Sequence, residues 1–167
     1  DRGATRGEID KLVLYAHGKG AVTVEDIEAV IGDVSALAMD AAIDAAFAGN
    51  LAELDRAFTR LMGEGVDAGT LLGYALRHAL ALAQARVGVD RGAPTAAAVK
   101  TIRGLYFKRE SAVERQLRVW TTPMLRGAVV DLGAGVAATR RQAGLASELA
   151  LKCLWSVALA ARRAARR

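Results

Sequence analysis

The sequence predicts an all-α protein: a helical bundle preceded by a short helical pair. Ala and Leu dominate its 167 residues, and only 2 prolines interrupt them. Val and Ile are scattered, without the alternation that a sheet would need. The length is sufficient for one or two domains with a sizeable core. These observations favour helices packed on helices.

The first 33 residues predict the helical pair. Thr5 and Glu8 form a capping box, an apolar stripe follows over residues 9–16, and two glycines at 18 and 20 end the helix. Thr23 caps a second short helix, whose first turn carries acidic residues that the helix dipole favours. The pair Gly32-Asp33 ends it. We therefore expect a boundary between residues 33 and 35.

Four helices are expected between residues 35 and 103. One begins near Ser35 and ends at Gly49, and Asn50 with Glu53 caps the next, which reaches Gly63. Asp67 caps a longer helix, and Thr95 caps a short one that reaches Arg103. Apolar spacing predicts these inward residues: Leu51, Leu54, Phe58, Leu61 and Met62, then Leu72, Leu76, Ala79, Leu80, Ala83 and Val87. His78 is interpreted as structural and not catalytic.

The segment Leu105–Trp120, called here the anchor segment, organises the rest of the chain. Tyr106 and Phe107 precede a basic pair, and a helical pattern then places Val113, Leu117 and Trp120 on one face. Its basic residues fall on other faces. One interpretation is a core or interface anchor formed by Tyr106, Phe107, Leu117, Trp120 and Trp155. The pattern also fits a core aromatic residue surrounded by solvated charges.

Two further helices are expected after residue 121. Thr122-Pro123 begins the first, with Leu125, Ala128, Val129, Leu132 and Val136 facing inward. Gly133 and Gly135 lie inside it and would permit close approach of another helix. The last helix, Leu145 to about Ala161, is almost wholly apolar and ends in a run of arginines. Such a helix is usually buried on several sides, which suggests contact with another subunit.

Charge is unevenly distributed along the chain. Residues 1–67 hold 6 basic and 13 acidic side chains, a net −7, whereas residues 91–126 hold 8 basic and 2 acidic ones, a net +6. A basic half of this kind fits contacts with phosphate or an acidic partner, and it fits a solvated surface equally well. The residues expected to make such contacts are Arg103, Lys108, Arg109, Arg115 and Arg118.

Catalytic motifs are scarce. The sequence has no phosphate-binding loop of the form G-x-x-x-x-G-K-[ST]. Two loose matches to the dinucleotide-binding pattern G-x-G-x-x-[GA], at residues 63–68 and 133–138, follow no expected strand and so fail its structural condition. With 2 histidines and 1 cysteine, neither a metal centre nor an internal disulfide is expected, and Cys153 reads as an inert core residue. We expect no cofactor. We also expect no bilayer-spanning apolar run and no signal peptide, hence a cytoplasmic protein. A first residue other than Met suggests a fragment.

The order of several motifs resembles the delta subunit of bacterial DNA polymerase III. RGEIDKL at 6–12 and TVEDIEAVIGD at 23–33 match the family patterns R-G-E-[IL]-x-K-L and T-x-E-D-[IV]-x-x-[VI]-x-x-D. The stretch 45–65, FKR at 107–109, QLRVW at 116–120 and the apolar last helix also resemble the family. Two features depart from it. Arg103-Gly104 stands where many relatives have a proline pair, and residues 142–144 lack the aromatic residue that contacts DNA in some relatives.

The resemblance implies a part of the clamp loader, a five-subunit ring of AAA+-like proteins that places the sliding clamp on primed DNA. Residues 1–33 would be the end of the lid domain, and residues 35–167 the collar that joins the subunits. The family's delta subunit lacks a working ATP site and contacts the clamp through an amino-terminal domain outside this chain. The implied partners are therefore the other loader subunits, with the clamp and primed DNA in the full complex, and no membrane.

Two other classes of function stay open. The basic half could make a helical nucleic-acid-binding domain whose affinity falls steeply with salt. An acidic second helix (Glu25, Asp26, Glu28) argues against DNA binding by the helical pair. An enzyme with a site assembled only in space is the third class.

Overall fold

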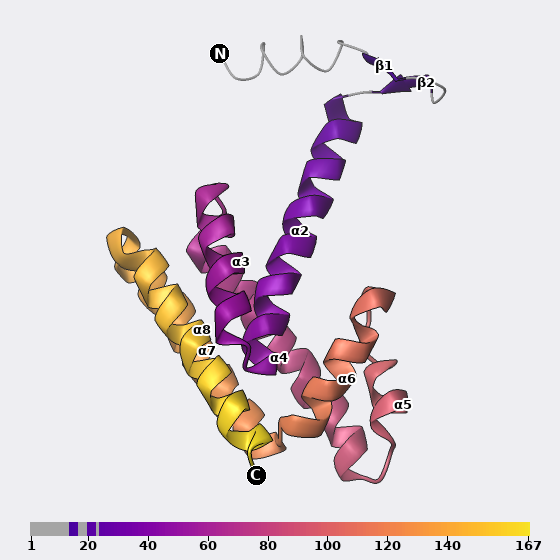
Figure 1. The fold of residues 1–167 in the computed structure, drawn as a ribbon, viewed down its shortest axis with the longest axis vertical. Coiled ribbons are helices and arrows are strands. Elements are labelled where there is room, and N and C mark those ends of the chain that lie inside the picture. The colour runs from indigo at the N-terminus through magenta and orange to yellow at the C-terminus, as the bar shows by residue number, and fades with distance from the viewer. Residues whose placement is uncertain (1–13, 17–19, 23) are drawn as a thin grey trace. The chain divides into compact units, whose positions relative to one another are not determined.

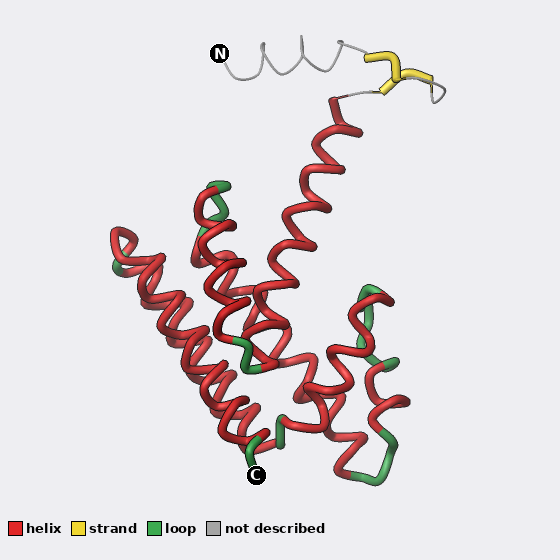
Figure 2. The backbone as a smooth tube through the Cα atoms, viewed as in Figure 1, coloured by secondary structure: helices red, strands yellow, loops and turns green. Residues whose placement is uncertain are grey.

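The computed structural model describes residues 14–16, 20–22 and 24–167, with side chains from residue 36 onward. Helices make up nearly all of the described chain, which confirms the all-α class (Figures 1 and 2). The chain divides into two compact units, residues 1–38 and 39–167.

The first unit differs from the predicted helical pair. Strand β1 (Leu14–Ala16) pairs antiparallel with β2 (Gly20–Val22), where we expected the end of a helix. Tyr and Val favour strands, and two nearby glycines provide the composition of a turn, so the short apolar stripe was misleading. The capping box at Thr5, the apolar residues up to Val13 and the Thr23 cap lie outside the described residues.

Helix α2 (Val24–Ala48) replaces the two helices predicted on either side of residue 33. Gly32-Asp33 does not end it, because helix-forming residues continue on both sides without a proline. The helix ends at Gly49 instead, which takes the left-handed conformation at φ 76°.

The second unit contains the carboxyl-terminal part of α2 from residue 39, together with the six helices and two short 3-10 turns that follow it. In chain order they are α3 (Leu51–Gly63), α4 (Ala68–Asp90), α5 (Thr95–Val99), η1 (Phe107–Arg109), α6 (Glu110–Val119), α7 (Thr122–Arg141), η2 (Ala143–Leu145) and α8 (Ala146–Ala165). Helix α4 packs against α7 and α8, α8 also packs against α3, and α5 packs against α6. In Figure 1, α7 and α8 run side by side along one flank of this unit.

Several predicted caps are confirmed. The side chain of Asn50 accepts the amide of Glu53 at 3.1 Å, and Asp67 accepts the amide of Thr70 at 2.8 Å. The Thr95 cap is wrong: Pro94 holds that position without a side-chain bond, and the Thr95 hydroxyl donates to Glu114. Helix α5 ends at Val99, well before Arg103.

The inward faces of α3, α6 and α7 agree with the apolar patterns. Leu54, Phe58 and Leu61 are buried in α3, and Leu125, Ala128 and Leu132 in α7. The prediction was partly wrong for α4, where Leu80 and Val87 are exposed and the buried residues are Ala68, Leu71, Leu72, Ala75, Ala79, Leu82 and Ala85. In a helix this rich in Ala and Leu, several faces are apolar, so periodicity alone does not select one.

Gly135 confirms the predicted close approach of helices, and Gly133 does not. A Cβ on Gly135 would lie 3.0 Å from Sγ of Cys153 in α8 and 3.2 Å from a methyl of Leu72 in α4. A Cβ on Gly133 would meet nothing within 4 Å. Cys153 is half-buried and not in the core, contrary to the prediction, and burial raises the pKa of its thiol to about 11, which favours the unreactive protonated form.

The segment Ala143–Ala165, which contains α8, is long and apolar enough to cross a membrane by length and composition. The expectation that no such run exists is therefore wrong on those two measures. Core helices of soluble proteins that are mostly buried reach the same values, whereas 22% of the most apolar 18-residue stretch of this segment is buried. Ala150, Leu154 and Ala158 are among the buried residues of α8.

Candidate interaction surface

The carboxyl end of the anchor segment is part of the core, as predicted. Leu117 and Trp120 are buried, and Trp120 is 1% exposed. The indole Nε1 of Trp120 donates to the carbonyl oxygen of Phe47 at 2.9 Å, and the two rings lie 5.0 Å apart. These contacts hold the end of α6 against the end of α2.

A polar network fixes the start of α6. The guanidinium of Arg109 donates to both carboxylate oxygens of Asp44, at 2.8 and 2.9 Å, and lies 3.2 Å from Asp40. Asp44 also accepts from Nε2 of Gln116 at 3.0 Å, and the Gln116 oxygen lies 2.6 Å from Nε2 of His78. The network joins α2, α4 and α6 next to the Phe47 ring, which packs edge-on against His78.

Burial governs the protonation of this network. It lowers the pKa of His78, although the Gln116 hydrogen bond and the Asp44 charge oppose the shift. Burial also opposes the charge on Arg109, but the hydrogen bonds and charge of Asp44 outweigh it and raise the pKa of Arg109. Burial raises the pKa of Asp40 against the pull of Arg109. The arrangement is a histidine with a lowered pKa beside the ion-paired Asp44 and Arg109.

The amino end of the anchor segment is exposed. Phe107 is 68% exposed, and Tyr106 packs edge-on against it at 5.0 Å between ring centroids. The Lys108 ammonium lies 6.0 Å above the Phe107 ring, at the outer limit of a cation–π contact. The structure thus divides the predicted anchor: Leu117 and Trp120 join the core, and the Tyr106–Phe107 pair faces solvent.

The five basic residues predicted to contact phosphate or an acidic partner differ in their surroundings. Arg109 is bound inside the unit, with a side chain 16% exposed. Arg118 pairs with Glu114 at 2.7 Å on the surface. Arg103, Lys108 and Arg115 are exposed and make no ion pair within residues 36–167. Trp155 is half-buried and donates from Nε1 to Asp55 at 2.7 Å, so it joins α8 to α3.

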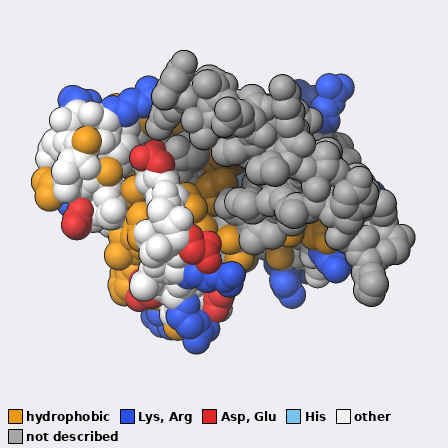
Figure 3. Space-filling view, turned by 90° about the horizontal axis from the view of Figure 1, so that it is seen from above, with side chains coloured by type: hydrophobic (Ala, Val, Ile, Leu, Met, Phe, Trp, Pro, Cys, Tyr) orange, Lys and Arg blue, Asp and Glu red, His pale blue; other side chains and the backbone are white. Residues whose placement is uncertain are grey.

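Three large apolar side chains of the segment α7–η2–α8, called here the α7–α8 flank, are exposed to solvent. Val130 of α7 is 69% exposed, and Leu145 of η2 and Leu159 of α8 are exposed as well. In Figure 3, the visible described residues show apolar side chains with basic and acidic groups beside them. Within residues 36–167, no cluster of His, Cys, Asp and Glu has the arrangement of a metal site.

Sequence reasoning missed the network around Asp44. Its only signal is that Asp40 and Asp44 lie four residues apart, on one face of a helix. Their partners stand some 65 residues away in the sequence, so no local pattern connects them. Comparisons with protein-family models, with curated proteins and with solved structures found no match.

Proposed function

We propose that this chain is a non-catalytic assembly module, the lid end and collar of a delta-type clamp-loader subunit that works in the cytoplasm. The exposed apolar flank of α7 and α8 is the observation that carries the proposal. Subunit interfaces bury apolar side chains, and Val130, Leu145 and Leu159 are exposed and available for such a contact. The motif order shared with the delta family supplies the identity of the partners.

Light scattering after size exclusion tests this role. We expect the chain, mixed with ATPase clamp-loader subunits at micromolar concentration, to form a complex of defined stoichiometry. Val130→Glu and Leu159→Glu should weaken it, because each places a charge in an apolar contact. Thr59→Glu, at an exposed site on α3, is the matched control. If the chain formed no complex with these partners, the result would contradict the proposal.

Nucleic-acid binding is a second candidate, favoured by the exposed Tyr106–Phe107 pair beside Lys108. Aromatic rings next to cations provide stacking and phosphate contacts for single strands. A fluorescence titration of primed DNA at several salt concentrations tests it. Binding that falls steeply with salt and is lost in Phe107→Ala would favour this function, whereas a flat salt response would rule it out.

A further inference from the structure

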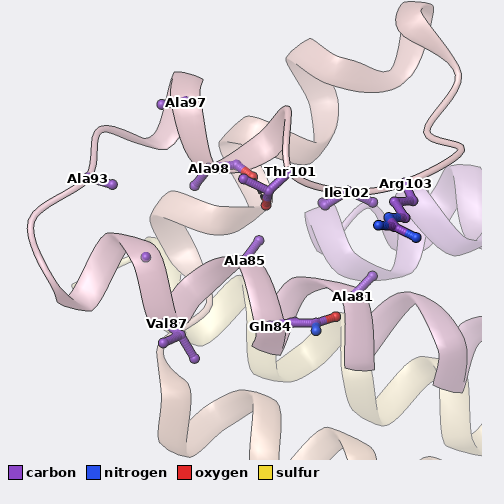
Figure 4. A pocket seen from close by; sticks show the side chains of 11 residues that line it. Ala81, Gln84, Ala85, Val87, Ala93, Ala97, Ala98, Thr101, Ile102 and Arg103 are labelled. Carbon is purple, nitrogen blue, oxygen red and sulfur yellow. Dashed lines mark hydrogen bonds between the residues drawn. The ribbon is translucent and has the colours of Figure 1, made fainter.

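A groove between α4 and the segment around α5 is lined by small side chains. The groove is half open to solvent and has a volume of about 730 Å³. One wall is formed by Ala81, Gln84, Ala85 and Gly88 of α4, and the other by Ala93, Ala97, Ala98 and the turn 101–103. Figure 4 shows Ala81 and Ala85 directed toward that turn. Their short side chains leave the groove open.

Glycine turns at both ends fix the outer wall. Gly92 and Gly104 have φ values of 103° and 73°, which L side chains rarely adopt. Ala98 and Val99 are buried, and the Thr95 hydroxyl donates to Glu114 of α6. The wall is therefore held in place by its own contacts, and the groove is preformed.

The outer wall is cationic. Residues 91–104 contain Arg91, Lys100 and Arg103 and no acidic residue. All three side chains are exposed. The carboxylates next to this segment accept hydrogen bonds from other residues. Asp90 accepts from Arg86 and Thr122, and Glu114 accepts from Thr95 and Arg118. Of the three cations, Arg103 lines the groove, whereas Arg91 and Lys100 lie on the same segment outside the lining. The groove thus combines a floor of mostly small apolar side chains with one arginine at its edge.

We infer that this groove binds an acidic amphipathic helix of a partner protein. Apolar side chains on one face of such a helix would enter the alanine-lined floor, and a carboxylate beside them would meet Arg103. Arg91 and Lys100 on the same segment add to the positive field there. The surface is separate from the α7–α8 flank and extends the proposed assembly role. The two proposals can therefore fail separately.

Fluorescence anisotropy of the full chain tests the inference. The probe is a labelled helix-forming peptide with leucines on one face and glutamates beside them, and a second peptide replaces each glutamate with lysine. We expect the acidic peptide to bind and the basic one not to. Arg103→Glu should weaken binding about tenfold or more, since it replaces an attraction with a repulsion. Ala97→Phe should abolish it by filling the groove.

Arg126→Glu is the matched control, because Arg126 is exposed on α7 and lies outside the groove lining. Circular dichroism would show that each variant keeps its helices. Equal loss in Arg126→Glu, no binding of the acidic peptide, or single-stranded DNA bound through Arg103 in its place would each overturn the inference. Peptide binding without a complex with the ATPase subunits would instead count against the proposed clamp-loader role alone.

Discussion

The indole of Trp120 donates a 2.9 Å hydrogen bond to the backbone carbonyl of Phe47, which joins the last residues of α6 and α2. Both side chains are about 1% exposed. Gly49 follows two residues after Phe47, and a Cβ there would lie 3.1 Å from the backbone nitrogen of Arg162 in α8. The end of α2 therefore lies close both to the end of α6, through Trp120, and to α8, through Gly49.

Trp120→Ala should lower the free energy of unfolding by ~3–5 kcal/mol, because it leaves a large cavity in the core. Trp120→Phe keeps most of the apolar contact and removes only the indole donor. It should cost less, about 1–3 kcal/mol for the Phe47 carbonyl left without this bond. Urea denaturation measures both values. Equal losses in the two variants would contradict the role given to packing.

The Asp44–Arg109 pair should couple strongly. Two charge-assisted hydrogen bonds in a mostly buried position predict a coupling energy of ~1–3 kcal/mol in a double-mutant cycle of Asp44→Ala and Arg109→Ala. Glu53 and Arg56 provide the control, since they form a similar pair on an exposed face of α3. That pair should couple by only ~0–1 kcal/mol. Similar values for the two cycles would show that burial adds nothing.

His78 should make stability depend on pH. Burial lowers its pKa in the folded state below the ordinary value of 6.5. As pH falls below that value, His78 binds a proton in the unfolded chain but stays unprotonated in the folded protein, so the free energy of unfolding decreases. Above it, His78 contributes no pH dependence. Asp40 acts in the opposite sense at lower pH, because its raised pKa favours protonation in the folded state.

Urea denaturation between about pH 7 and pH 5 measures this effect, since the unperturbed histidine titrates in that range. We expect the wild-type protein to lose stability across the range. His78→Gln should show a smaller loss, because glutamine keeps a donor for Gln116 and does not titrate. An unchanged slope in the variant would assign the pH dependence to other groups.

Local patterns predicted the parts of the fold that local physics determines. The caps at Asn50 and Asp67 and the buried face of Val113, Leu117 and Trp120 follow from spacing within one helix. The boundary at Gly32-Asp33 failed because a glycine is tolerated within a helix when nothing else interrupts it. The prediction of the buried face of α4 was partly wrong because alanine and leucine occur on every side of that helix.

The candidate surface was less predictable, because it depends on contacts between distant segments. From the sequence we assigned Phe107 and Trp120 to one anchor, and Arg103 and Arg109 to one set of basic contacts. The structure separates both pairs: Asp44 holds Arg109 inside the unit, and the turn before η1 leaves Phe107 in solvent. The α4–α5 groove has no sequence signal beyond small residues and a run of unopposed positive charge.

Gly133 and Gly135 provide a matched test of helix packing in α7. Alanine at 133 meets nothing and gains helix propensity, so Gly133→Ala should stabilise by ~0.5–1 kcal/mol. Alanine at 135 meets Cys153 and the buried Leu72, so Gly135→Ala should destabilise by ~1–3 kcal/mol. Adding Cys153→Ala should recover part of that loss, because it removes the 3.0 Å contact. Thermal and urea denaturation measure the stability of the three variants. If Gly133→Ala and Gly135→Ala both stabilised the protein, α7 and α8 would be able to move apart freely, which would contradict the close approach at Gly135.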